Sequence, residues 1–309
     1  MDEVARSRSL LRRAGLAFGP FMILGALLVG LYLTSPFGSI EAISDADALS
    51  ILWMLTVVGA LAGVVPVMLG MLWYPFLRTL TNRWIYAVLA LSAGVLTFAG
   101  VEMLGGIADH ASGRPATGPA VAIVGVTGAF VALLGVSRWQ YRKVRSAPSE
   151  TGLQVAYLIA IGLGLHSFGE GLAIGTAFVQ GDGRLVTLLV IAFILDNVTE
   201  GPTIVAAIAR HTERPHLGHF VLMGVIAGGP VIVGGWVGSL AMAPLVAVLF
   251  FAIGLGAIIE VIWELVRFIG HSEGGTMRAA FTPTNALMFL LGFLVMTSID
   301  LLLIDTLLL

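Results

Sequence analysis

Long apolar stretches separated by short polar segments run through the chain. A membrane-spanning helix needs roughly 20 mostly apolar residues, and nine stretches approach or exceed that length. They cover about residues 14–34, 51–75, 84–106, 119–137, 153–178, 185–209, 217–240, 243–269 and 284–307. We therefore predict an all-α, polytopic membrane helical bundle of nine spans. The first stretch follows several arginines, but its apolar core is too long for a signal peptide, so we expect a retained helix.

Composition agrees with a chain whose solvent is lipid. Charged residues make up 11% and hydrophobic residues 58% of the 309 positions, which excludes an ordinary soluble domain. Cysteine is absent, so disulfides and soft-metal sites built from thiolates are excluded. We expect the bilayer as a partner and no nucleic acid.

Basic residues alternate from loop to loop along the nine predicted spans. Of the 16 Lys and Arg residues, all but Arg114 and Arg184 fall on one side of the membrane in this arrangement. Short loops rich in Lys and Arg face the cytoplasm. The pattern therefore predicts a cytoplasmic amino terminus, an extracellular or periplasmic carboxyl terminus, and a multi-pass protein of the plasma (inner) membrane.

Ionisable residues occur inside only a few of the predicted spans. A carboxylate at mid-membrane costs a few kcal/mol or more, so each one is a functional hypothesis that faces the bundle interior or a water-filled cavity. The residues concerned are Glu102, His166, Glu170, Asp196, Glu200, Glu260, Glu264, Asp300 and Asp305. We expect Asp305, near the outer interface, to be solvated.

Two of these segments read as copies of one another. His166 is followed four residues later by Glu170 and then a glycine, and Asp196 is followed in the same way by Glu200 and Gly201. Residues at i and i+4 lie on one face of a helix. If the two faces pack together, one imidazole and three carboxylates converge, a ligand set that suits Zn, Fe, Mn, Co or Cd. Three clustered acids cannot all stay ionised in low dielectric without a cation or a shared proton.

Pro202, which follows the second motif, removes a backbone hydrogen bond from its helix. We expect the helix to be loosened beside the ligands, as it is where irregular backbone lines an ion path.

The paired motifs resemble those of the ZIP (Zrt- and Irt-like protein) family, whose members bring zinc, iron and related divalent metals into the cytoplasm. The resemblance implies an eight-helix transporter core at 51–309, after a unit at 1–50 that holds a cytoplasmic tail, an additional helix and an outer loop. It also implies a main metal site at His166, Glu170, Asp196 and Glu200, with a transported divalent metal as substrate and an elevator-like movement. Ser167 and Asn197 stand at a weaker secondary position, and Gly169 and Thr199 replace the motif prolines. We therefore expect one main site.

The remaining acids each have two readings. Glu260 and Glu264 share a helix face and could relay metal toward the cytoplasm, although Glu264 could equally form an ordinary helix-surface pair with Arg267. Glu102 and Asp300 could serve at an entrance or in proton coupling, or simply form hydrogen bonds between packed helices.

Three functions remain open from the sequence. The first is a carrier of divalent metal, which is not an enzyme. The second is an intramembrane metalloenzyme, against which stands the absence of an HExxH-type helix. The third is a carrier of protons or an organic solute that uses the same acids without metal. The metal preference and the choice between monomer and homodimer also stay open.

Overall fold

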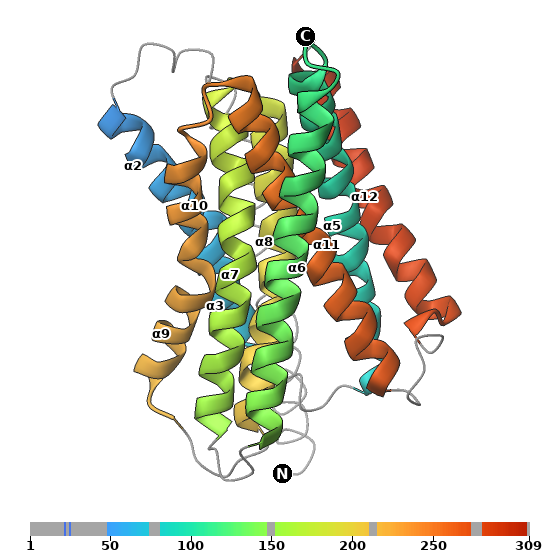
Figure 1. Cartoon of the computed structure of the whole chain (residues 1–309). Coiled ribbons are helices and arrows are strands. Elements are labelled where there is room, and N and C mark those ends of the chain that lie inside the picture. The colour runs from blue at the N-terminus through green and yellow to red at the C-terminus, as the bar shows by residue number, and fades with distance from the viewer. Residues whose placement is uncertain are drawn as a thin grey trace, which may run out of the picture.

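The computed structural model describes Met22, Gly25 and residues 48–73, 81–146, 152–209, 215–272 and 280–307. The secondary structure of these residues is helical, with turns between the helices and no strand in the described ranges (Figure 1). Eight helices are long and apolar enough to cross a membrane, and they coincide with the last eight predicted spans. The chain is thus a multi-pass helical membrane bundle. The predicted first span at 14–34 lies outside the described residues, apart from two isolated positions.

The eight spans are built from continuous and interrupted helices. Six spans are each one continuous helix: α5 (Asn82–Ala111), α6 (Thr117–Ser146), α7 (Gly152–Val179), α8 (Gly183–Ala209), α11 (Pro244–Ser272) and α12 (Pro283–Leu307). The interrupted ones are α2 (Ala48–Gly59), η2 (Ala60–Val64) and α3 (Val65–Met71), which form one span, and α9 (Leu217–Gly228) and α10 (Pro230–Gly238), which form another.

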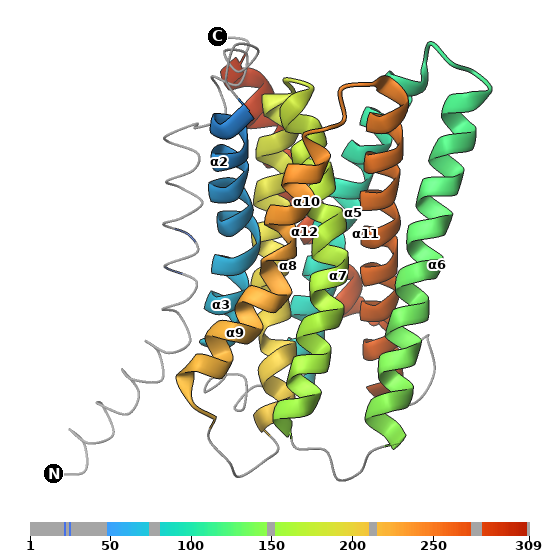
Figure 2. The same cartoon turned by 60° about the vertical axis from the view of Figure 1, so that its left-hand side comes forward.

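The helices form two groups that meet along the middle of the molecule. In the first bundle, α7 packs against α10, α8 and α9, and α3 packs against α8. In the second bundle, α5 packs against α12 and α11, and α11 packs against α6. The two bundles meet mainly where α7 faces α11 and where α8 faces α5 (Figures 1 and 2). Of the eight spans described, α8 is the most deeply buried.

Glycines bring the helices within each bundle into backbone contact. In the first bundle a Cβ at Gly63 would overlap the carbonyl of Gly228, and one at Gly175 would overlap that of Gly235. In the second bundle a Cβ at Gly94 would overlap the carbonyl of Phe289. Because apolar surface gains little from leaving lipid, such close packing is a main source of helix association in a membrane. Each bundle is therefore a tightly packed unit.

Proline interrupts the span formed by α2, η2 and α3, and another proline is accommodated inside α8. Pro66 follows a single turn of π-helix, η2, and cannot donate to the carbonyl of Ala62, four residues earlier. Pro202 lies within α8, which continues past it to Ala209. The carbonyl of Val198, which loses its helical donor to Pro202, faces Gly70 of α3. Beside Glu200, therefore, α8 is not broken, and the effect of Pro202 is a carbonyl without its helical donor that faces a neighbouring helix.

Successive spans run antiparallel, which gives the bundle two distinct ends. The upper end is where α8 begins and α12 ends, and the lower end is where α8 ends and α12 begins (Figure 2). Among the described residues, Arg83, Arg138 and Arg267 lie in the lower half, whereas Arg114 and Arg184 lie at the upper end. The helix order therefore keeps the charge asymmetry seen in the sequence.

Gly175→Ala should lower the melting temperature of the purified protein in detergent by several degrees. The added methyl group meets backbone atoms of Gly235, which cannot rotate away, and overpacking of this kind costs about 1–3 kcal/mol. Gly128→Ala in α6 is the matched control, because a Cβ there meets nothing within 4 Å. Equal melting temperatures for the two variants would contradict the backbone-contact interpretation.

Candidate functional site

The four predicted main-site residues lie in the first bundle, buried between α7 and α8. His166 and Glu170 come from α7, and Asp196 and Glu200 come from α8. Their exposed fractions are 7%, 2%, 1% and 6%. The Nε2 atom of His166 lies 2.6 Å from Oε1 of Glu200. The predicted packing of the two motif faces is therefore present, with one direct contact between them.

Asn197 connects Glu170 to the interrupted span that η2 and α3 belong to. Its Nδ2 atom donates to Oε2 of Glu170 at 3.2 Å and to the carbonyl of Ala62 at 3.1 Å. That carbonyl is the one that Pro66 leaves without its helical donor. The interruption at η2 therefore supplies a backbone acceptor at the site. Asn197 binds this acceptor and Glu170 at the same time, which holds Glu170 in place.

Ser167 does not contribute its hydroxyl to this cluster. Its Oγ donates to the carbonyl of Leu163 at 2.9 Å, within its own helix. Of the two residues predicted for the secondary position, Asn197 contacts a main-site carboxylate, and Ser167 is buried beside it with its hydroxyl satisfied locally.

Ser92 brings the second bundle into the site, a contribution that the motif analysis missed. It lies on α5 and its hydroxyl donates to Oδ1 of Asp196. Thr199 lies close by, with its Oγ1 2.8 Å from the carbonyl of Asp196 and 3.1 Å from Oγ of Ser92. Ser92 is a single serine in an apolar span and belongs to no motif. Its contact with Asp196 is therefore evident only from the packing of α5 against α8.

Three buried oxygen atoms on one turn of α8 have no hydrogen-bond donor. They are Oδ2 of Asp196, Oδ1 of Asn197 and Oε2 of Glu200. An unsatisfied buried acceptor costs about 1–3 kcal/mol, and more when it is charged, so buried polar atoms almost always have a partner. The cluster therefore has unused capacity to accept protons or a cation.

The main-site side chains surround this turn without meeting at one point. His166, Glu170, Asp196 and Glu200 are all close enough to interact electrostatically. Within the part of the chain that the structure describes, however, no three His, Asp or Glu side chains are grouped closely enough to hold a metal ion. Simultaneous coordination by the four would require their side chains to move inward.

The two acids of α11 have different surroundings. Glu260 is buried and accepts a hydrogen bond at 2.6 Å from Ser137 of α6, and it is close enough to His166 to interact with it electrostatically. Glu264 is paired with Arg267 of its own helix at 2.7 Å. The geometry at Glu264 is thus the helix-surface pair that the sequence left as an alternative, whereas Glu260 faces the interior.

Glu102 and Asp300 are held by Arg184, which the sequence analysis had assigned to a loop. Arg184 lies in the first turn of α8, and its guanidinium is 3.2 Å from Glu102 of α5 and 2.6 Å from Asp300 of α12. Both acids therefore form ion pairs between packed helices. The sequence signal was a basic residue next to a predicted span boundary, which indicates that Arg184 could enter the membrane but does not say which acids it meets.

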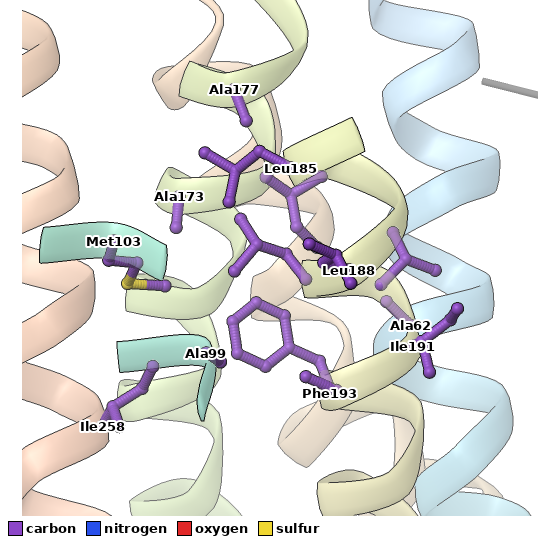
Figure 3. Packing of buried hydrophobic residues seen from close by; sticks show 14 of the residues in the cluster. Ala62, Ala99, Met103, Ala173, Ala177, Leu185, Leu188, Ile191, Phe193 and Ile258 are labelled. Carbon is purple, nitrogen blue, oxygen red and sulfur yellow. The ribbon is translucent and has the colours of Figure 1, made fainter. Parts of the chain in front are cut away.

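Apolar side chains fill the space between the main site and the upper end. Ala173, Ala177, Leu185, Leu188 and Phe193 point toward one another from α7 and α8 (Figure 3). Ala99 and Met103 of α5 close the same cluster from the second bundle. We call these seven residues the apolar plug. In this conformation it separates the site from the upper end.

No protein-family model matches the chain, and no curated protein matches its sequence.

Ser92→Ala should lower the melting temperature of the purified protein, because Asp196 then loses a buried hydrogen bond. The expected loss of stability is about 1–3 kcal/mol. Ser298→Ala is the control, since that hydroxyl is exposed and donates only to Leu294 of its own helix. Thermal unfolding in the same detergent measures both, and a change no larger than the control's would remove Ser92 from the site.

Proposed function

We propose that the chain is a membrane carrier that moves divalent transition-metal ions into the cytoplasm, with the carboxylate cluster of α7 and α8 as its transport site. The observation that carries this proposal is the set of three buried oxygens on α8 that have no donor, next to the pair formed by His166 and Glu200. A divalent cation would compensate these acids and occupy their free lone pairs at once. The paired motifs of the ZIP type support the same function.

The donor set favours metals of intermediate and hard character. It offers carboxylate and amide oxygens with a single imidazole, and the chain has no cysteine. Such ligands suit Zn, Fe, Mn, Co or Cd, but not Cu(I). We propose Zn²⁺ as the first substrate to test. In this proposal His166, Glu170, Asp196 and Glu200 bind the ion, while Asn197 positions Glu170.

The contact of the site with the second bundle supports transport rather than catalysis. Asp196 belongs to the first bundle, and its donor Ser92 belongs to the second. A displacement of one bundle against the other therefore changes the coordination available at Asp196. That coupling is what a carrier requires, because binding must alternate with release. Glu260, which is buried on α11 and close enough to His166 to interact with it electrostatically, is the residue that we propose for the exit path.

The charge distribution supports an orientation with the lower end in the cytoplasm. The described basic residues of the lower half correspond to loops that the positive-inside rule assigns to the cytoplasm. We propose accordingly that the amino terminus is cytoplasmic, that the carboxyl terminus is extracellular or periplasmic, and that the protein resides in the plasma (inner) membrane. The upper end would then be the side from which metal enters.

Added Zn²⁺ should raise the melting temperature of the purified wild-type protein, because a ligand that binds the native state stabilises it by about 2.7 kcal/mol at a hundredfold excess over Kd. Asp196→Asn and Glu200→Gln should each reduce the shift, whereas Asp109→Asn, an exposed acid at the upper end, should keep it. Differential scanning fluorimetry with Zn²⁺, Mn²⁺, Co²⁺ and Cd²⁺ provides the measurement. No shift with any of these metals would favour the carrier of protons or organic solute.

Zn²⁺ uptake into proteoliposomes should be saturable for the wild type and lost in Glu170→Ala and Glu200→Ala, because each variant removes a binding carboxylate. Asp109→Ala removes an exposed carboxylate and should transport at the wild-type rate. Reconstituted amounts are matched by quantitative gel before a metal-sensitive dye reports the influx. Uptake that persists in both site variants would place the transport site elsewhere.

A further inference from the structure

A three-residue ion-pair cluster ties the upper end of α8 to two helices of the second bundle. The guanidinium of Arg184 donates from Nε to Oδ1 of Asp300 at 2.8 Å, and its Nη2 lies 2.6 Å from the same oxygen. Its Nη1 lies 3.2 Å from Oε2 of Glu102. Arginine can form such contacts with two acids at once because its donors point in several fixed directions.

The cluster crosses the boundary between the bundles. Arg184 belongs to the first bundle, and Glu102 and Asp300 belong to the second. The site contact between Ser92 and Asp196 crosses the same boundary between α5 and α8, 12 residues further along α8. At 1.5 Å per residue the two connections are roughly 18 Å apart. Together they fix α8 against α5 at two heights.

Burial gives these ion pairs more strength than surface pairs have. The side chains of Glu102 and Asp300 are 17% and 12% exposed, and that of Arg184 is 32% exposed. Water therefore screens the attraction only in part. The apolar plug lies directly below, between the cluster and the main site. Separation of α8 from α5 and α12 at this end would break the ion pairs and open the plug together.

We propose that Arg184 is a latch that holds the upper end of the carrier closed and must release Glu102 and Asp300 before the transport site can open to that end. This inference rests on the proposed function in treating the plug as a barrier that opens during transport. Arg184 acts through the position of α8 and touches no substrate. Glu102 and Asp300 serve as its counter-ions, which is a different role from the entrance site or proton relay considered for them from sequence.

The partial exposure of the cluster allows its ion pairs to separate as well as to form. When the latch opens, water at the upper end can hydrate all three charged groups, because each is already partly exposed. The cost of opening is therefore far below that of exposing an ion pair to lipid. A fully buried pair would lock the end permanently, and a fully exposed one would contribute little.

The absence of native cysteine allows a direct test of closure. Ala173→Cys places a thiol in the plug, where Ala173 faces Gly254 of α11 across the bundle boundary. The rate of its reaction with a charged maleimide is measured in nanodiscs, where both faces are accessible and no metal is needed. Arg184→Gln in this background should raise the rate roughly fivefold or more, the factor that about 1 kcal/mol supplies. Arg184→Lys should stay closer to the parent.

Two further measurements keep the test independent of a folding defect. Raising the ionic strength should accelerate labelling of Ala173→Cys when Arg184 is intact, and should have little effect in Arg184→Gln, because salt screens only the pair that exists. The charge swap of Arg184→Glu with Asp300→Arg, which reverses the shortest pair of the cluster, should restore slow labelling. Ser112→Cys, exposed at the upper end, should react at the same rate in every background.

An unchanged labelling rate in Arg184→Gln, or no dependence on ionic strength with Arg184 present, would overturn the latch. Faster labelling in Arg184→Gln, together with slow labelling in the charge-swap variant, would support the latch. The outcome is separable from that of the proposed function. Zinc uptake with unchanged labelling retains the carrier and removes the latch, whereas faster labelling in a protein that transports no metal retains the latch as a closure device and removes the metal substrate.

Discussion

The central constraint on this molecule is that three carboxylates and an imidazole lie almost completely buried inside a membrane bundle. A polar atom buried there is costly unless it has a hydrogen-bond partner or a compensating charge. Glu170 is held by Asn197, Asp196 is held by Ser92, and His166 is paired with Glu200. Three oxygens of α8 remain without a donor. The position of the helices around α8, including the interruption at η2, supplies these partners. The three oxygens left without a donor define what the site can bind.

The packing of the helices separates what is rigid from what can move. Within each bundle, glycines bring backbones into contact, as at Gly175 and Gly94, and such contacts leave no freedom for sliding. Between the bundles, the connections at α8 are polar and reversible: the hydrogen bond from Ser92 and the ion pairs of Arg184. A relative movement of the two bundles would break these polar contacts at the site and at the upper end, and it would also shift the apolar packing of α7 against α11.

Much of the candidate site could be predicted because helical periodicity is local. The spacing of four residues from His166 to Glu170 places both on one face of α7, and the same spacing applies on α8. The pair of Glu264 with Arg267 was also available as a local alternative. Ser92 and Arg184 could not be assigned, because their partners are 104 and 82 or more residues away and only packing decides which face meets which.

The sequence by itself determined the number and approximate bounds of the described spans, their antiparallel order and the identity of the acids in the membrane. Those features follow from the length of an apolar helix and from the cost of a buried charge, which are properties of single segments. Only the tertiary structure decided that Asn197 reaches the carbonyl freed by Pro66, and that Arg184 neutralises Glu102 and Asp300. Such contacts depend on the rotation and height of each helix against its neighbours, which no segment specifies alone.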